Sequence, residues 1–311
     1  MSTDYPFVSI LLATYNRKSW LEECLESLFN QDYPKERYEI IVINDGSNDG
    51  TEKVLRAYEK KAPCTFIWHT QRNQGKTVAL NTGLNNTTKG EIVLFTDDDC
   101  VADKNWIKNL LSAFKDEKVG GVGGKILAYK PKNHVEKYGV FFDQEGSVSL
   151  ATGNAAYRSH VVKSVGGFDT QLIGLEDIDF GVRVRGKGYK LKYTPEAIIY
   201  HRNYCSLDRL IKRKRSEGRQ LYNLSTKYEH YFNARKLIIK ISFEAVKKVI
   251  LLGNISKIIN NRNRKGIFLR EIFEAVVLIS TLLGLIEGML RRKTYDYKGD
   301  KIHDKFNFEF D

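Results

Sequence analysis

The sequence predicts an α/β domain, in which helices flank a mainly parallel central sheet, followed by a helical C-terminal extension. Short apolar runs alternate with stretches of helical periodicity over residues 1–127, as in parallel strands joined by helices. Residues 208–292 look entirely helical. The charge also changes along the chain: residues 1–200 hold 26 basic and 26 acidic residues, whereas residues 201–311 hold 24 and 12 and carry the whole net charge of +12.

Four apolar runs in the N-terminal half predict buried strands, and the stretches between them have helical periodicity. The expected strands cover residues 7–13, 40–43, 65–68 and 92–95, and the expected helices cover about 17–29, 50–60, 75–87 and 103–115. Ligands bind beyond the carboxyl ends of the strands in such sheets. The first candidates for a binding site are therefore the polar residues that follow three of these strands, at 14–16, 44–47 and 97–99.

Beyond residue 127 the sequence predicts a loop and three further elements. Glycine residues and helix-start signals mark where each of these segments begins or ends. The segments are a loop or edge hairpin around 130–147, a short helix before a glycine-rich turn at 166–169, a helix from Glu176 to about Gly186, and a strand at 197–200 that ends in His201.

The C-terminal third is basic and contains one uncharged run at 275–286. Twelve helical residues rise about 18 Å, which is less than the roughly 30 Å of the hydrocarbon core of a bilayer. The run therefore favours an in-plane or hairpin membrane helix, or a buried packing helix, over a single span. A basic run at 209–219 is suited to an anionic lipid surface or a diphosphate, and equally to a solvated helix face.

The sequence lacks the motifs that are typical of several functional classes. A P-loop needs glycine at the position of Thr70, and a GxGxxG motif needs its last glycine at the position of Ile126. No motif for binding RNA or DNA is present, so we expect no nucleic-acid partner. The four cysteines form no CxxC pair and the first residues lack the regions of a secretory signal, which predicts reduced thiols and a cytoplasmic location.

Three consecutive carboxylates, Asp97 to Asp99, follow a predicted buried strand. They repel one another there, and a hard divalent cation such as Mg²⁺ or Mn²⁺ would supply the counter-charge. On an extended backbone Asp97 and Asp99 point the same way and Asp98 the opposite way, so either those two hold the metal or Asp99 holds it with its neighbours on a ribose. His201 could complete such a site, although a hydrogen-bonded histidine at a strand edge would look the same.

Two carboxylates, Glu176 and Asp177, begin a predicted helix. The free N–H groups and the dipole of a helix N-terminus stabilise carboxylates, which is a complete structural explanation for one of them. The functional alternative is a general base that takes a proton from a hydroxyl nucleophile. The segment 71–76 also precedes a helix and could form an anion-binding turn.

Taken together, these motifs resemble those of the glycosyltransferases of family 2, a large inverting group with the GT-A fold. The resemblance runs from about residue 7 to residue 220, and the order and spacing of its motifs make it specific. The motifs that carry it are residues 8–10 with 14–16, 43–47 with 49–51, 73–76 with 79–81, 95–99, 166–169, and 176–180 with Arg183 and 188–189.

The resemblance implies a role for each matching residue. Asp97 and Asp99 correspond to the metal-binding DxD motif, and His201 to a histidine that completes the metal site in some members. Asp177 matches the catalytic base, and Glu176 its neighbour that helps to place the acceptor. The residues implied at the donor are Thr14, Asn16 and Asp45 at the base and ribose, Arg72, Asn73 and Lys76 nearby, Asp98 beside the metal, and Arg215 and Arg219 within reach of the diphosphate.

The implied enzyme uses Mn²⁺ or Mg²⁺ and a UDP-, dTDP- or GDP-linked sugar. It is non-processive, because the QxxRW motif of processive synthases does not follow the base. We expect a catalytic domain at 1–225, with a nucleotide-sugar half at about 1–127 and an acceptor half at 128–225, and a basic helical region at 226–311 that associates with an anionic membrane surface. The acceptor would be a glycan or a lipid-linked sugar at the inner face of the cell membrane, in the synthesis of cell-surface polysaccharide or glycoconjugate.

Two other interpretations stay open at this point. A sugar-1-phosphate nucleotidyltransferase also uses an α/β sheet and acidic metal ligands, but it needs a glycine-rich basic loop after the first strand, where residues 14–18 contain no glycine. A non-catalytic protein whose basic tail binds nucleic acid or lipid would show no metal-dependent binding of a nucleotide sugar.

Overall fold

The computed structural model describes residues 5–86, 88–132, 149–202, 206–228, 234–256 and 262–291. The chain forms two compact units. The sheet unit holds the described residues of 5–129, 149–170 and 176–202, and the helical unit holds the C-terminal helices. The loop or hairpin predicted around 130–147 lies, apart from residues 130–132, outside the described residues.

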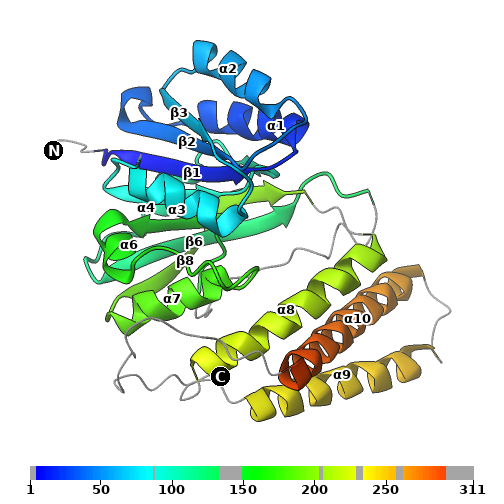
Figure 1. The fold of residues 1–311 in the computed structure, drawn as a ribbon. Coiled ribbons are helices and arrows are strands. Elements are labelled where there is room, and N and C mark those ends of the chain that lie inside the picture. Colours follow the sequence, from blue (N-terminus) through cyan, green and yellow to red (C-terminus); the bar gives the residue numbers. More distant parts are fainter. Residues whose placement is uncertain are drawn as a thin grey trace. The chain divides into compact units, whose positions relative to one another are not determined.

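In its described residues, the sheet unit contains eight strands in the order β3-β2-β1-β4-β7-β6-β8-β5 (Figure 1). Parallel pairing joins β1 to β2 and β4, β2 to β3, and β6 to β8, whereas β7 runs antiparallel to β4 and β6, and β5 antiparallel to β8. The predicted parallel sheet is thus confirmed for its first four strands, and the other half is mixed. The strands are β1 (Val8–Thr14), β2 (Tyr38–Asn44), β3 (Thr65–Thr70), β4 (Ile92–Thr96), β5 (Cys100–Ala102), β6 (Val119–Ala128), β7 (Asn154–Arg158) and β8 (Lys190–His201).

Six α-helices of the sheet unit accompany these strands within its described residues. The helix expected over 103–115 is shorter in the structure, because the chain leaves it through tight turns after Leu111. The strand expected at 197–200 is longer, since a bulge at 195–197 lets it continue back to Lys190. The helices are α1 (Lys18–Phe29), α2 (Thr51–Lys61), α3 (Lys76–Asn86), α4 (Trp106–Leu111), α6 (Ser159–Val165) and α7 (Glu176–Gly186), with a short 3₁₀ turn η1 (Lys35–Arg37).

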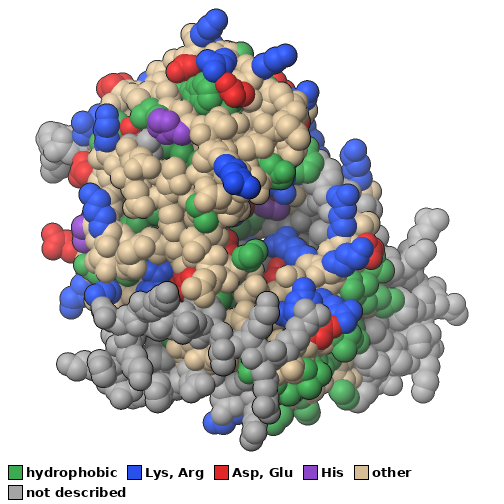
Figure 2. All heavy atoms as spheres, viewed as in Figure 1, with side chains coloured by type: hydrophobic (Ala, Val, Ile, Leu, Met, Phe, Trp, Pro, Cys, Tyr) green, Lys and Arg blue, Asp and Glu red, His purple; other side chains and the backbone are tan. Residues whose placement is uncertain are grey.

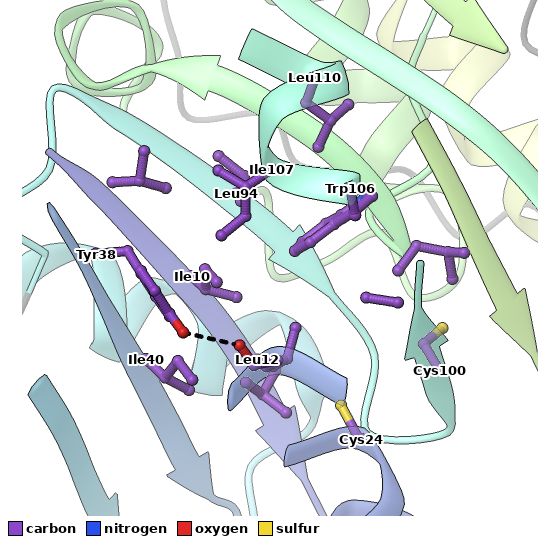
Figure 3. Packing of buried hydrophobic residues seen from close by; sticks show 14 of the residues in the cluster. Ile10, Leu12, Cys24, Tyr38, Ile40, Leu94, Cys100, Trp106, Ile107 and Leu110 are labelled. Atoms are coloured by element: carbon purple, nitrogen blue, oxygen red, sulfur yellow. Dashed lines mark hydrogen bonds between the residues drawn. The ribbon is translucent and has the colours of Figure 1, made fainter. Parts of the chain in front are cut away.

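Apolar side chains fill both faces of the sheet, as a helix-covered parallel sheet requires. Alternate residues of β1 supply the two sides: Ile10 and Leu12 belong to one buried cluster and Leu11 to the other. Helices α1, α2 and α4 cover the first cluster, and α3, α6 and α7 cover the second. Figure 3 shows the first cluster, where the buried Tyr38 hydroxyl donates to the Leu28 carbonyl oxygen at 3.1 Å and so ties β2 to α1.

The helical unit consists of α8 (Leu207–Lys227), α9 (Ala234–Ser256) and α10 (Arg262–Arg291), and α10 contacts both of the others (Figure 1). Glycine allows α8 and α10 to approach closely. A Cβ atom at Gly284 would overlap the Arg215 carbonyl oxygen, and one at Gly218 would overlap the Thr281 carbonyl oxygen. Neither position therefore accepts a side chain without separating the helices.

Helix α10 extends well beyond the uncharged run at 275–286. Its segment Glu271–Leu290 has 20 residues and a mean hydropathy of 1.9, and 28% of the most apolar part is buried. By length and composition this is one helix, within the described part of the chain, that could cross a membrane, a test that some core helices of soluble proteins also meet. Because this apolar segment has 20 residues and not twelve, its length alone does not disfavour a single membrane span.

Candidate active site

The candidate site lies where β1, β2 and β4 end. Thr14, Asn44 and Thr96 are the last residues of these strands. The antiparallel strand β7 starts at the same edge, because Asn154 pairs with Thr96. Gly153 precedes it, and a Cβ atom there would lie 3.4 Å from Oδ2 of Asp97. The acidic triplet thus follows β4 directly and lies next to the start of β7.

The loops after β1 and β2 form one hydrogen-bonded platform. Asn16 adopts a left-handed backbone conformation, with φ of 52°, which asparagine tolerates better than most residues. Its backbone N–H donates to Oγ of Ser47 at 2.9 Å, and its side-chain oxygen accepts the N–H of Asn48 at 2.8 Å. The Asp45 N–H donates to the Thr14 carbonyl oxygen at 2.9 Å. Three of the predicted donor residues therefore lie together at this edge of the sheet.

Asp45 is buried and organises the loop at 71–75. Its carboxylate accepts bonds from Nε2 of Gln71 at 2.8 Å and from the backbone N–H groups of Gln74 at 2.9 Å and Gly75 at 2.8 Å. The side chain of Asn73 donates to the Asp45 carbonyl oxygen at 3.1 Å. Asp45 thus has a loop-shaping role that the sequence did not reveal. Its predicted contact with the nucleotide stays a prediction, as does that of the exposed Arg72 in the same loop.

The acidic triplet forms a turn, not an extended strand, because β4 ends at Thr96 and the Cys100 N–H donates to the Asp97 carbonyl oxygen at 3.1 Å. Asp98 and Asp99 therefore converge on one cation. Nη1 of Arg17 lies 2.9 Å from Oδ1 of Asp98 and 2.9 Å from Oδ2 of Asp99. The expectation that Asp98 points away from both of its neighbours was wrong, since it assumed strand alternation where the chain turns.

Lys76 connects the triplet to the second acidic pair. Its Nζ lies 2.5 Å from Oδ1 of Asp97 and donates to Oγ1 of Thr152 at 3.1 Å. Burial lowers the pKa of Lys76, but Asp97 and then Glu176 outweigh it and leave that pKa raised. Burial likewise raises the pKa of Asp97, and Lys76 more than reverses the effect. Lys76 therefore balances carboxylates from the end of β4 and from the start of α7.

Two carboxyl groups have pKa values above the ordinary range. Burial raises the pKa of Asp98 to about 6, although Arg17 opposes the effect. Burial, and then repulsion by Glu176, raises the pKa of Asp177 to about 7, against the opposing charge of Lys76. A carboxyl group with a pKa near neutrality is suited to accept a proton in a reaction at that pH.

The structure brings Asp99 and His201 together. Strand β5 pairs antiparallel with β8 so that Cys100 stands opposite His201, and Nε2 of His201 lies 3.3 Å from Oδ1 of Asp99. Nδ1 of His201 is buried and has no hydrogen-bond partner among the described residues. One ligand atom from each of Asp99, Cys100 and His201 lies within 4.8 Å of the other two. Carboxylate and imidazole donors in this arrangement fit a divalent cation.

Three residues near the triplet were not identified from the sequence as site residues: Arg17, Cys100 and Thr152. Cys100 directly follows the triplet, which was the available signal, whereas the partners of Arg17 lie more than 80 positions away. Arg215 and Arg219 lie on α8 in the helical unit, and both bind Glu287 of α10, Arg219 at 3.0 Å. Their predicted contact with a diphosphate stays a prediction.

Two protein families and several known proteins match this chain. The family described as Glycosyl transferase family 2 matches residues 9–165, and Glycosyl transferase family group 2 matches residues 92–286. Glycosyltransferase AglE of Haloferax volcanii is 30% identical over 209 residues, which cover 65% of this chain and 68% of the relative. A dolichyl N-acetyl-alpha-D-glucosaminyl phosphate 3-beta-D-2,3-diacetamido-2,3-dideoxy-beta-D-glucuronosyltransferase of Methanococcus voltae is 27% identical over 231 residues, covering 68% of this chain and 72% of the relative.

The fold has a close match among solved structures. The mannosyltransferase PcManGT from Pyrobaculum calidifontis, in complex with GDP-Man and Mn²⁺, superimposes with a TM-score of 0.67 at 20% identity, covering 94% of this chain and 89% of that one. The molecule is thus a glycosyltransferase with a GT-A fold and a helical C-terminal extension. Its sequence places it in glycosyltransferase family 2, to which the chain belongs.

The raised pKa of Asp177 predicts a pH-dependent cost to stability. Because the pKa rises from 3.8 to about 7 on folding, the folded chain binds this proton more tightly, and stability falls as the pH rises from about 4 to about 7. The variant Asp177→Asn lacks this cost. We expect its free energy of unfolding, relative to the original protein, to be about 1–3 kcal/mol greater at pH 8 than at pH 4.5, measured in urea.

A matched control for this experiment is Glu36→Gln, which removes an exposed carboxylate near the opposite end of β2. It removes the same formal charge away from the site, so we expect no comparable gain. A difference between Asp177→Asn and the original protein that stays constant across this pH range would contradict the raised pKa.

Proposed function

We propose that this chain is a metal-dependent, inverting and non-processive glycosyltransferase, which moves a sugar from a nucleotide-sugar donor to a hydroxyl group of a glycan or lipid-linked acceptor. The observation that carries the proposal is the linkage of two acidic groups through Lys76: Asp97 at the end of β4, and Glu176 with Asp177 at the start of α7. One group is suited to a cation beside a diphosphate and the other to proton transfer.

The donor would lie along the edge where β1, β2 and β4 end. Thr14, Asn16 and Asp45 are proposed for the base and ribose, because their loops form the platform at this edge. The remaining proposed donor residues add positive charge or hydrogen-bond donors for the phosphates, or flank the metal. They are Arg72, Asn73, Lys76, Asp97, Asp98, Arg215 and Arg219.

Asp97, Asp99 and His201 would hold Mn²⁺ or Mg²⁺. When bound, such an ion neutralises the charge that develops on the departing nucleoside diphosphate. Within the protein, Arg17 and Lys76 place positive charge beside the triplet, and the same two side chains are proposed to attract the phosphates of the donor. Nε2 of His201 lies 3.3 Å from Oδ1 of Asp99, so these two proposed ligands are already next to each other.

Asp177 is the proposed general base. It would take the proton from the acceptor hydroxyl, whose oxygen attacks the anomeric carbon from the face opposite the diphosphate, so that the configuration inverts without a covalent enzyme intermediate. Glu176 would help to place the acceptor. The pKa of about 7 for Asp177 supports this assignment, because the carboxylate then binds a proton strongly enough to remove it from a nucleophile.

A lipid-linked acceptor at the inner face of the cell membrane is proposed from two independent features. The relative from Methanococcus voltae has a dolichyl phosphate sugar in its name. The helical unit exposes Ile239, Phe243 and Val246 at helical spacing on α9, and the exposed Lys236, Lys240 and Lys247 lie on the same helix. Figure 2 shows hydrophobic side chains gathered at the surface over the C-terminal helices.

The proposed pathway is the synthesis of a cell-surface polysaccharide or glycoconjugate. We assign catalysis to residues 1–225 and membrane association to residues 226–311. Helix α8 belongs to the helical unit, but most of it is included in the proposed catalytic region because Arg215 and Arg219 are proposed donor contacts.

Thermal unfolding with a series of nucleotide sugars tests the donor and the metal. With Mn²⁺ present, one nucleotide among the UDP-, dTDP- and GDP-linked sugars should stabilise the protein, by about 2.7 kcal/mol at a concentration 100 times its Kd. A chelator or Asp99→Asn should remove the effect, whereas Asp32→Asn, an exposed carboxylate in an ion pair with Lys108, should not. Equal stabilisation in chelator would contradict metal dependence, and release of pyrophosphate from a nucleoside triphosphate would favour a nucleotidyltransferase.

Steady-state kinetics with the identified donor test the base. Asp177→Asn should reduce kcat at least about 100-fold while donor binding is retained, because an amide cannot accept the proton of the acceptor hydroxyl as a carboxylate does. In the original protein, kcat/KM should fall roughly tenfold for each pH unit below about 7, as Asp177 becomes protonated. Glu176→Gln should raise the KM for the acceptor more than it lowers kcat. A loss of only a few-fold in Asp177→Asn would move the base to another residue.

Vesicle flotation tests the membrane proposal. The variant Ile239→Glu with Phe243→Glu replaces two exposed apolar side chains on α9, and it should weaken binding to anionic vesicles by at least roughly tenfold. Leu207→Glu is a matched control, since Leu207 is an exposed apolar residue on α8. Equal loss of binding in both proteins would show a general effect of charge, and unchanged binding of the double variant would contradict the role of α9.

A further inference from the structure

We propose that Asp99, Cys100 and His201 form a second coordination set, which binds a thiophilic divalent ion such as Zn²⁺ or Co²⁺ through the Cys100 thiolate and excludes Mn²⁺. The inference rests on the proposed function, because Asp99 and His201 belong to both sets. It adds to that function a soft-metal binding mode in which such ions inhibit the enzyme.

The geometry of the three ligand atoms supports this set. Oδ1 of Asp99 lies 3.3 Å from Nε2 of His201 and 4.0 Å from Sγ of Cys100. Neighbouring ligand atoms around a tetrahedral Zn²⁺ ion are roughly 3.3–3.6 Å apart, given the usual bond lengths to oxygen, nitrogen and sulfur. The nitrogen and oxygen already have this spacing, and the sulfur, which lies 4.0 Å from the oxygen and within 4.8 Å of the nitrogen, would move inward when an ion binds.

The strand pairing fixes this arrangement. Cys100 and His201 are directly opposite each other in the antiparallel pair of β5 and β8, so their side chains lie on the same face of the sheet. Asp99 immediately precedes β5 and turns its carboxylate toward both. The backbone register thus brings Cys100 and His201 together, and the turn before β5 adds Asp99.

The chemistry of sulfur distinguishes the two binding modes. Thiolate ligands favour Zn²⁺ and Co²⁺, whereas Mn²⁺ and Mg²⁺ favour oxygen. When Zn²⁺ or Co²⁺ binds, the S–H bond of Cys100 breaks, a metal–sulfur bond forms and the proton leaves to solvent, with no change of oxidation state.

The soft-metal mode leaves too few positions for the donor. Carboxylate, imidazole and thiolate occupy three of the four positions of a tetrahedral ion, so one position stays open. A six-coordinate ion with two or three protein ligands has room for two diphosphate oxygens at once. Zn²⁺ bound through Cys100 should accordingly block productive donor binding.

Two other described cysteines provide matched controls. Cys24 lies on α1, and its Sγ donates to the Asp97 carbonyl oxygen at 3.5 Å, so it is the alternative thiol near the triplet (Figure 3). Cys64 precedes β3 and lies beside Tyr38, where burial raises its pKa to about 11. Neither sulfur belongs to a group of three ligand atoms like that of Cys100 among the described residues.

Cobalt spectroscopy of the full-length protein tests the proposal directly. Co²⁺ alone should produce a thiolate-to-metal charge-transfer band in the near ultraviolet and the intense visible bands of a tetrahedral ion, with release of one thiol proton per ion. Cys100→Ser should abolish the charge-transfer band, whereas Cys24→Ser and Cys64→Ser should retain it. Absence of the band in the original protein, or its loss in Cys24→Ser but not in Cys100→Ser, would overturn the proposal.

Displacement of Mn²⁺ provides a second readout that does not depend on activity. The electron paramagnetic resonance signal of free Mn²⁺ reports how much Zn²⁺ releases the bound ion, and Cys100→Ser should raise the required Zn²⁺ concentration by roughly tenfold or more. If Mn²⁺ binds and Zn²⁺ displaces it equally from both proteins, the soft-metal mode fails and the proposed function stands. If no Mn²⁺ binds to the original protein, the metal-dependent function fails as well.

Discussion

Concentrated negative charge at one edge of a buried sheet is the constraint on which the site depends. Asp97, Asp98 and Asp99 follow β4, and Glu176 and Asp177 begin α7. Uncompensated carboxylates would repel one another strongly where water is largely excluded. Arg17, which directly precedes α1, and Lys76, at the start of α3, supply positive charge, and His201 at the end of β8 lies beside Asp99. Each of these residues comes from a different part of the chain, so the site exists only when the sheet is assembled.

Much of the fold was predictable because burial leaves a direct trace in the sequence. The apolar runs of β1, β2 and β4 are buried on both faces, and the predicted and observed strands overlap almost completely. The start of α7 at Glu176 was also predicted correctly, since helix-start signals are local. What the sequence could not give was the second half of the sheet, where antiparallel pairing depends on contacts between distant segments.

The site was likewise predictable where its residues belong to local motifs, and not where they depend on contacts between distant segments. Sequence motifs identified the carboxylates and His201, but they could not show that the triplet turns or that Arg17 bridges two of its members. Cys100 escaped notice because β5 has only three residues, too few for a periodic pattern, and its pairing with β8 spans 101 positions. Glu287 directly follows the uncharged run at 275–286, and nothing local in the sequence shows that it binds two arginines of α8.

Asp45 has a consequence for how quickly a donor is captured. Its carboxylate accepts hydrogen bonds from the segment 71–75 within the protein itself, and a Cβ atom at Gly46 would lie only 2.8 Å from the Asn73 nitrogen. The segment therefore loses its conformational freedom when the polypeptide folds, not when a nucleotide arrives. At the proposed donor site, a nucleotide sugar would meet a segment that is already ordered, so that association would be limited by diffusion and orientation more than by the ordering of this segment.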